Sequence, residues 1–294
     1  MTGSILAPKD FRRYFEQRAI ETAGVRLDKR WEYRAAGALA AVMRENGATT
    51  WEQLETLLDA PGTGSALVER LVGEVTVQET RLFRDAGQMR LLREEVLPDV
   101  CKRAIERKMP LRVWSAGCAS GEEAYSLAML AAECTREGRD LPYTVVGTDI
   151  SASAIATARR GVYREPEEGS CGREFRSLFD RYTVADAEGM ISVSEEIRRN
   201  TRFAVRNLLG TLPVRGQDFV LCRNVMMYLS TDARERLIRR LWDSLVPGGW
   251  LLTGEADLIH QIPNLFETRN YGRVALYRRP LSASPLRTGG ELHG

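Results

Sequence analysis

Residues 111–151 read LRVWSAGCASGEEAYSLAMLAAECTREGRDLPYTVVGTDIS, and this stretch decides the fold. The apolar residues 111–115 predict a strand, the Ala-, Leu- and Met-rich residues 122–137 predict a helix, and residues 143–149 predict a second strand. Short apolar strands joined by helices are typical of parallel sheets with right-handed crossovers. We therefore expect an α/β fold with a doubly wound, Rossmann-like sheet.

The same alternation continues toward the C-terminus and extends the predicted sheet. A helix capped by Ser151 follows the second strand, and Pro247 closes a later helix. The further expected elements are strands at 202–205, 218–222, 250–254 and 274–278 and helices at 151–160 and 231–245. Residues 161–200 break the alternation with a short helix at 173–179 and two extended stretches, which predict a small inserted antiparallel β-hairpin.

Residues 9–75 contain only helical patterns. Thr50 followed by Gln53 is a capping-box pattern, and Asp28 is placed to cap the helix that Gly47 ends. After residue 281 the chain has little to bury, so we expect a mobile tail. The predicted organisation is an all-α N-terminal domain at 1–75, a linker at 76–90, an α/β domain at 91–280 with its β-subdomain at about 161–200, and a tail at 281–294.

The composition excludes several protein classes. The 42 basic and 40 acidic residues give a net charge of +2, which argues against a nucleic-acid binder that relies on bulk phosphate attraction. No apolar run reaches the ~20 residues of a membrane span and no signal-peptide pattern is present, so we expect a cytoplasmic protein. The five cysteines contain no CxxC pair, which favours thiols in a reducing compartment over a disulfide framework or a zinc site. His260 and His293 are too few for a histidine-based metal cluster, and we assign no catalytic part to His260.

The first predicted strand leads into a glycine-bearing loop, SAGCASGEE (115–123), at the start of a helix. In an open α/β sheet, ligands bind beyond the carboxyl ends of the strands. Glu122 and Glu123 would repel a pyrophosphate at this helix N-terminus, but they suit a positively charged, phosphate-free ligand such as S-adenosylmethionine (SAM). Acidic residues also favour any first helical turn. We favour that structural role for Glu123 and a ligand contact for Glu122.

Polar residues also follow the second and fourth predicted strands. Asp149 ends the second strand, where a carboxylate can accept both hydroxyls of a ribose or cap the next helix. Because a glycine loop precedes it, we favour ligand contact. Arg223, Asn224 and Tyr228 lie at the same edge, although an exposed Arg and an N-capping Asn would account for the first two equally well. We expect Cys222 to be a buried hydrophobe.

Six segments, taken in order, resemble the chemotaxis receptor glutamate methyltransferases, bacterial enzymes that methylate chemoreceptors with SAM. The resemblance covers roughly residues 10–280, including the helical N-terminal part and the inserted β-hairpin. The segments are VTVQETRLFRD (75–85), WSAGCASGEEAYSLAM (114–129), VVGTDIS (145–151), FAVRNLL (203–209), FVLCRNVMMYL (219–229) and LVPGGWLLTGEAD (245–257). The implied activity is transfer of a methyl group to glutamate carboxylates, which forms glutamyl methyl esters in sensory adaptation.

The resemblance implies roles for individual residues. In the family, the segment between the domains folds over the cofactor, and its Asn-x-Thr-x-Phe-Phe-Arg pattern maps onto Gln78, Thr80 and Arg84. Gln78 replaces the usual Asn and Leu82 replaces the first Phe, so we expect looser packing over the cofactor. The other implied positions are Glu122 at the methionine part, Asp149 at the ribose, Asn207 and Leu208 near the adenine, Arg223 and Asn224 as further cofactor contacts, and Arg84 and Tyr228 beside the transferred methyl.

The resemblance also implies a partner, the cytoplasmic helical bundle of methyl-accepting chemoreceptors, whose helices are rich in Glu. A local excess of basic side chains suits such a surface, and a solvated helix face would account for it equally well. We expect a monomer with no metal, no nucleic-acid partner and no membrane insertion. The basic residues are Lys9, Arg12, Arg13, Arg18, Arg26, Lys29, Arg30 and Arg34.

Three alternatives stay open. A SAM-dependent methyltransferase of another substrate shares the cofactor motifs, but it does not explain the helical domain and the hairpin together. A non-catalytic scaffold that senses the cofactor is favoured only by Gln78 and Leu82. A nicotinamide dehydrogenase is disfavoured by Glu122, Glu123 and the lack of a GxGxxG motif.

Overall fold

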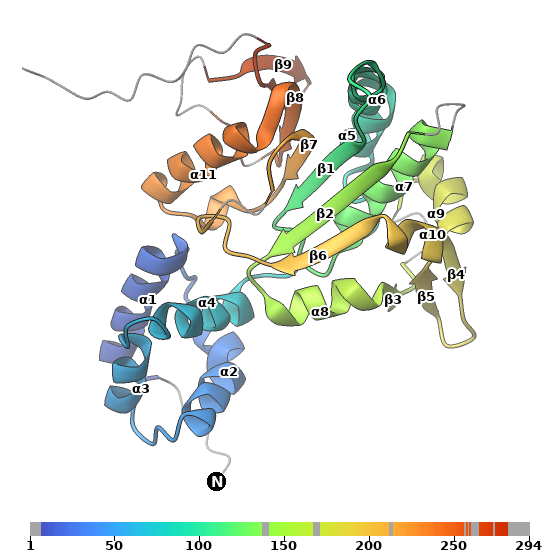
Figure 1. The fold of residues 1–294 in the computed structure, drawn as a ribbon. Coiled ribbons are helices and arrows are strands. Elements are labelled where there is room, and N and C mark those ends of the chain that lie inside the picture. Colours follow the sequence, from blue (N-terminus) through green and yellow to red (C-terminus); the bar gives the residue numbers. More distant parts are fainter. Residues whose placement is uncertain are drawn as a thin grey trace, which may run out of the picture.

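A seven-stranded sheet in the order β6-β2-β1-β7-β8-β10-β9 forms the centre of the protein (Figure 1). The structure is a computed structural model that describes residues 7–136, 141–166, 171–211, 214–255, 257, 259, 265–272 and 274–281. The first five strands in this order run parallel, whereas β10 is antiparallel to both neighbours. The strands are β1 (Leu111–Ala116), β2 (Tyr143–Asp149), β6 (Thr201–Val205), β7 (Gln217–Cys222), β8 (Leu245–Thr253), β9 (Glu267–Tyr271) and β10 (Val274–Arg278). The predicted doubly wound α/β sheet is confirmed.

Burial explains which strands the sequence predicts. All six residues of β7 are buried, so the strand reads as an apolar run that is easily found. In β9, all five residues (ETRNY) are exposed. The sequence does not predict β9, because this strand is held by backbone pairing with β10 and not by an apolar face.

Helices cover both faces of the sheet. They include α5 (Ala86–Leu91), α6 (Leu97–Glu106), α7 (Glu122–Arg136), α8 (Ala152–Arg160) and α11 (Thr231–Ser244). One hydrophobic core joins α6 and α7 to Val113, Phe219 and Leu252 of the sheet. A second core joins α11 and the N-terminal helices to Trp114 and Val220. Neighbouring strand residues thus enter opposite cores, because side chains alternate across a strand.

One helical run with an irregular middle precedes β1. A π-helical segment, η1 (Leu92–Val96), joins α5 to α6. The run begins directly after Asp85. It therefore continues from the segment that contains Gln78, Thr80 and Arg84, onto which the family's pattern maps.

Four helices precede this run and lie near the carboxyl ends of the central strands (Figure 1). They are α1 (Lys9–Ala23), α2 (Trp31–Glu45), α3 (Trp51–Leu58) and α4 (Gly64–Val75). The predicted capping box of Thr50 and Gln53 is confirmed at the start of α3. The predicted N-cap role of Asp28 is wrong. Arg30 occupies the N-cap position of α2, and Asp28 forms a turn before it and pairs with Arg34.

Backbone contacts fix these helices against the edge of the sheet. The N–H of Arg26 donates to the carbonyl of Tyr228 (2.7 Å), and the N–H of Ser230 donates to the carbonyl of Gly24 (2.8 Å). Gly73 of α4 lies so close to β2 that a Cβ there would be 2.8 Å from the Ile150 carbonyl oxygen. The N-terminal helices are therefore close enough to form part of any site at these strand ends.

The inserted segment forms a three-stranded antiparallel sheet in the order β3-β5-β4. The predicted hairpin corresponds to β4 (Thr183–Ala185) and β5 (Met190–Val193). The sequence does not predict β3 (Val162–Arg164), which is three residues long and too short to show alternation. The helices η2 (Arg173–Phe175), α9 (Arg176–Tyr182) and α10 (Glu195–Arg199) complete the insert. His260 and residues 282–294 of the predicted tail lie outside the described residues.

Candidate functional site

Two adjoining cavities open at the carboxyl ends of β1, β2 and β7. Residues 76–85, which we call the strap, contribute to the walls of both. The first cavity is lined by, among others, Gln78, Asp149, Asn207, Leu208, Asn224 and Tyr228. The second is lined by, among others, Thr80, Arg84, Glu123, Arg223, Asn224 and Tyr228. Because Val77, Gly117, Asn224 and Tyr228 line both, the two spaces are contiguous.

The loop after β1 brings backbone to the edge of both cavities. Gly117 has a φ of +80°, and a Cβ there would lie 2.4 Å from Cγ2 of Val225. The N–H groups of Gly117 and Cys118 both donate to the carbonyl of Thr148 at the end of β2. Glycine is therefore needed at position 117 for conformation and for space.

Asp149 lines the first cavity from the end of β2. Its carboxylate accepts the N–H of Ala119 and the N–H of Ser151, each at 2.9 Å. Burial raises its pKa, and these backbone hydrogen bonds oppose that shift. The Ile150 N–H and the Gln78 side chain also interact with this carboxylate and oppose the rise of its pKa, so a ligand donor would add to or replace contacts that Asp149 already makes. Capping of α8 is performed by Ser151, as predicted.

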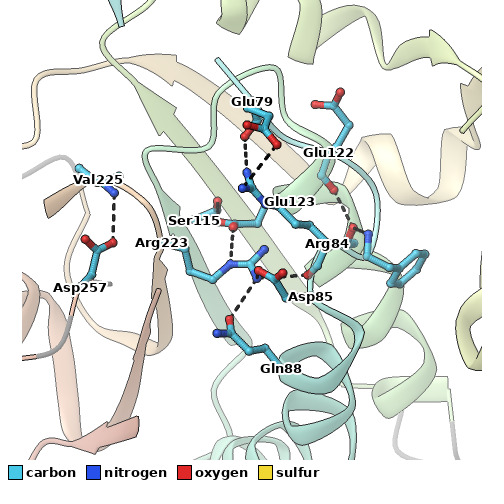
Figure 2. A network of polar contacts seen from close by, with 12 residues as sticks. Glu79, Arg84, Asp85, Gln88, Ser115, Glu122, Glu123, Arg223, Val225 and Asp257 are labelled. Atoms are coloured by element: carbon cyan, nitrogen blue, oxygen red, sulfur yellow. Dashed lines mark hydrogen bonds and ion pairs between the residues drawn. The ribbon is translucent and has the colours of Figure 1, made fainter. Parts of the chain in front are cut away.

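The two glutamates at the start of α7 differ in their surroundings. Glu123 is buried and accepts hydrogen bonds from the Ser115 hydroxyl and from Nε of Arg223, both at 2.8 Å. Glu123 therefore has the structural role that the sequence favours. Glu122 accepts a hydrogen bond from the Ser120 hydroxyl (2.7 Å), and burial raises its pKa. Its carboxylate points away from Arg223 (Figure 2), and it is not among the residues that line either cavity.

Arg223 is the centre of a buried polar network (Figure 2). Its side chain is 1% exposed and pairs with Glu123 (2.8 Å) and Asp85 (2.9 Å). Its Nη1 also donates to Oε1 of Gln88 (3.0 Å) and to the carbonyl of Arg84 (3.1 Å). The alternative interpretation of Arg223 as an exposed residue is therefore wrong. The guanidinium joins the end of β7 to the strap and to the start of α5.

The strap is anchored by its aromatic residue. The N–H of Phe83 donates to the hydroxyl of Ser126 (2.8 Å), and its ring stacks on Phe175 with centroids 4.9 Å apart. Leu82 is buried in the same core, and neither side chain lines the two cavities. The expected looser packing at Leu82 is therefore not seen: this side chain packs into the protein.

Arg84 on the strap and Tyr228 in the segment after β7 both line the second cavity. Arg84 donates through Nη1 to the carbonyl of Glu79 (2.6 Å), and its Nη2 is 3.7 Å from the Glu79 carboxylate. Because Glu79 is largely exposed, this ion pair is weak and leaves the guanidinium available to an anion.

A buried carboxylate that sequence reasoning missed supports the segment after β7. Asp257 accepts the N–H of Val225 (3.2 Å) and the N–H of Met227 (3.0 Å), and burial raises its pKa (Figure 2). Asn224, just before these donors, has a φ of +56°. Asp257 thus holds the turn that presents Asn224 and Tyr228 to both cavities.

Comparison with known proteins decides the family. Residues 78–274 match the family described as "CheR methyltransferase, SAM binding domain". The chain belongs to the CheR methyltransferase family. It is 31% identical over 265 residues to a chemotaxis protein methyltransferase of Vibrio anguillarum, covering 88% of this chain and 91% of the relative. It is 29% identical over 263 residues to chemotaxis protein methyltransferase 1 of Pseudomonas aeruginosa, covering 88% of this chain and 93% of the relative.

The first cavity of this CheR-family chain fits SAM. Gln78 donates through Nε2 to the hydroxyl of Thr76 (2.7 Å), while its buried Oε1 has no hydrogen-bond partner. That orphaned acceptor and the Asp149 carboxylate line one cavity. Hydroxyl and amino groups of an adenosyl ligand are donors that such acceptors would satisfy. The two acceptors come from different elements, Asp149 from the end of β2 and Gln78 from the strap, and their contact with SAM stays a prediction.

Asn207 and Leu208 also reach the first cavity, but the Asn207 side chain is already engaged. Its amide nitrogen donates to the carbonyl of Thr22 (3.0 Å) and to the carboxylate of Glu69 (2.8 Å). Its amide oxygen accepts the N–H of Leu209. In this CheR-family chain, Asn207 fastens the N-terminal helices to the cavity wall, a role that sequence reasoning missed.

Within the described part of the chain, no group of three or more His, Cys, Asp or Glu side chains is arranged to hold a metal ion. Nor does any of its helices have the length and apolar character that crossing a bilayer requires. Cys222 is fully buried, and burial raises the pKa of its thiol well above the ordinary value, as expected of an inert hydrophobe.

Proposed function

We propose that this CheR-family methyltransferase transfers the methyl group of SAM to glutamate side chains of chemoreceptors and forms glutamyl methyl esters. The observation that carries the proposal is the pair of contiguous cavities. One presents acceptors, Asp149 and Gln78, and the other presents a cation, Arg84. A neutral or cationic substrate group would gain nothing from Arg84, whereas a carboxylate would.

Individual cofactor contacts follow from the same geometry. We assign Asp149 to the ribose hydroxyls and Gln78 to a neighbouring donor, because both acceptors line the first cavity. Leu208 supplies apolar surface there for the adenine, and Asn207 holds that wall in place. In the second cavity, Thr80, Arg84 and Asn224 lie where the methionine end would extend. Glu122 would meet the ammonium group from the edge of the second cavity, and Arg223 acts by holding the strap.

We expect the protein to act in the cytoplasm.

The chemistry needs orientation more than acid–base help. When bound, SAM supplies a methyl group made electrophilic by the sulfonium. A glutamate carboxylate has a pKa near ~4.3, so it is ionised at neutral pH and needs no general base. Arg84 and Tyr228 would hold this carboxylate in line with the methyl group. The hydrogen bond from Arg84 to the Glu79 carbonyl would fix the direction of the guanidinium and leave its charge available to the carboxylate.

Alkali lability of the product tests the proposed function. The full chain is incubated with a receptor cytoplasmic fragment and methyl-labelled SAM, and the labelled protein is then treated with mild alkali. We expect label on the receptor that alkali releases as methanol, and mass spectrometry that places it on glutamates. Alkali-stable label, or transfer only to nucleic acid or a small molecule, would show a methyltransferase of another class.

The exposed basic residues of α1 and of the segment before α2 form the surface that we assign to receptor docking. Arg12, Arg18 and Arg34 already pair with acidic side chains of this chain, so they contribute little net attraction. The remaining basic residues are exposed, and they suit the Glu-rich helices of a chemoreceptor bundle. They are Lys9, Arg13, Arg26, Lys29 and Arg30.

Charge reversal on this surface is expected to weaken receptor docking without affecting chemistry. The double change Arg13→Glu and Arg30→Glu should raise the KM for receptor about 5- to 10-fold at low salt and leave kcat unchanged. The difference should shrink as ionic strength rises. Lys102→Glu with Lys108→Glu, at exposed positions on α6 and just after it, is the matched control, because α6 lies away from α1 and α2 (Figure 1). Equal KM values for both double variants at low salt would contradict the assignment of this surface to receptor docking.

Loss of the Asp149 carboxylate is expected to weaken cofactor binding. Asp149→Ala should lower SAM affinity about 10- to 100-fold, because hydrogen bonds to a charged acceptor contribute roughly 1.5–3 kcal/mol. Calorimetry measures this change, and thermal unfolding checks that the variant is folded. Asp180→Ala, at an exposed ion pair of the insert, is the control. Wild-type affinity in a folded Asp149→Ala protein would place the ribose elsewhere.

A further inference from the structure

Two cysteines meet where α6 packs against α7. The Sγ atoms of Cys101 and Cys134 are 2.8 Å apart, closer than the roughly 3.5–4.0 Å at which non-bonded heavy atoms ordinarily rest. Cys101 is fully buried, and Cys134, near the end of α7, is half-buried. We propose that Cys101 and Cys134 are an oxidisable pair whose disulfide clamps α6 to α7.

The surroundings make this contact a defined site. Both cysteines belong to the hydrophobic core that α6 and α7 share, so neighbouring side chains hold the two helices in place. A disulfide forms only when the two residues already approach closely, because its geometry is narrow. In this fold the approach is part of the native packing, and oxidation needs little movement of either helix.

The accessible partner sets the order of the chemistry. A hydroperoxide oxidises the half-buried Cys134 thiol to a sulfenic acid and is itself reduced to water or an alcohol. The Cys101 sulfur then attacks the Cys134 sulfur. The S–O bond breaks, the Cys101 proton and the hydroxyl leave as water, and the S–S bond forms. A thiol such as dithiothreitol restores both cysteines by exchange.

The position of the clamp connects it to the SAM site. The bond would close a loop that contains β1, residues 117–121 and the first turn of α7. On the other side, α6 continues through η1 and α5 to the strap. Oxidation would therefore restrain the two helical runs that adjoin the strap and the loop after β1, which line the cavities.

Peptide mapping after oxidation tests the pair. The full chain is treated with hydrogen peroxide, blocked with an alkylating agent and cut with trypsin and glutamyl endopeptidase. The second protease is needed because Cys118 and Cys134 share a tryptic peptide but are separated by Glu122, Glu123 and Glu133. We expect one linked product joining the Cys101 and Cys134 peptides, lighter by two hydrogen atoms than the sum of the reduced peptides and absent after dithiothreitol.

Thermal unfolding supplies the second readout. Closing a loop of this length should raise the Tm of the oxidised protein by roughly 5–10 °C, reversibly with dithiothreitol. Cys134→Ser should abolish both the linked peptide and the shift, whereas the control Cys171→Ser should keep both. The proposal is overturned if Cys101 and Cys134 are alkylated in full after peroxide treatment. A shift that persists in Cys134→Ser overturns it equally.

Discussion

Replacing Arg84 with Ala is expected to lower methyl transfer to receptor glutamates about 100- to 1,000-fold at saturating SAM and receptor. Arg84 lines the second cavity, where a substrate carboxylate would lie beside Tyr228. Its pairing with Glu79 is weak enough to leave the charge available to the substrate. Removing the cation would leave the carboxylate unoriented, so the loss should appear in kcat. Steady-state kinetics with labelled SAM measures it.

Two variants of the same strap control this experiment. Arg84→Lys keeps the charge but lacks the planar fork of donors, so we expect only partial activity. Arg81→Ala removes an exposed basic residue three positions earlier and should leave kcat near wild type. Normal turnover by Arg84→Ala would contradict the orienting role, and equal losses in Arg81→Ala would indicate a general effect of strap charge.

Arg223→Met is expected to have the largest effect on stability. The change leaves Glu123 buried without its countercharge and removes the bonds to Asp85 and the Arg84 carbonyl. Breaking a buried pair on one side costs about 3–5 kcal/mol. For a chain of this size that corresponds to a fall in Tm of roughly 10 °C, measured by calorimetry.

The compensating variant separates charge from packing. Adding Glu123→Gln to Arg223→Met should recover part of the lost stability, because the uncompensated charge is removed and Ser115 still has an acceptor. Arg199→Met, which breaks an ion pair whose Arg is 75% exposed, should cost under about 1 kcal/mol. An Arg223→Met protein as stable as Arg199→Met would mean that the network does not hold the strap.

Local patterns account for most of the fold. The apolar runs at β1, β2 and β7, and the Thr50 capping box, are readable because burial or a short-range hydrogen bond determines them. β9 and β3 escape prediction because backbone pairing, with β10 and β5 respectively, forms them without an apolar pattern of their own. The prediction for Asp28 was wrong for a related reason. A local rule places Asp28 at the N-cap of α2, whereas its side chain pairs with Arg34, six residues later.

Local patterns likewise predict some residues of the candidate site and miss others. Asp149 and the glycine loop can be located from the sequence, because carboxyl ends of neighbouring parallel strands meet at one edge. The role of Arg223 depends on Asp85 and Gln88, which lie 138 and 135 residues away in the chain. No spacing rule connects such positions. Asp257 and the engagement of Asn207 with Glu69 were missed for the same reason.

A crystal structure of the chain with S-adenosylhomocysteine, solved with a receptor peptide that contains a methylatable glutamate, tests the central claim most directly. The account predicts ribose hydroxyls on Asp149 and adenine beside Leu208. It also predicts the ligand sulfur at the junction of the two cavities, with the glutamate carboxylate on Arg84. An adenosyl group bound away from Asp149, or a receptor carboxylate that approaches the sulfur without passing Arg84 and Tyr228, would contradict it.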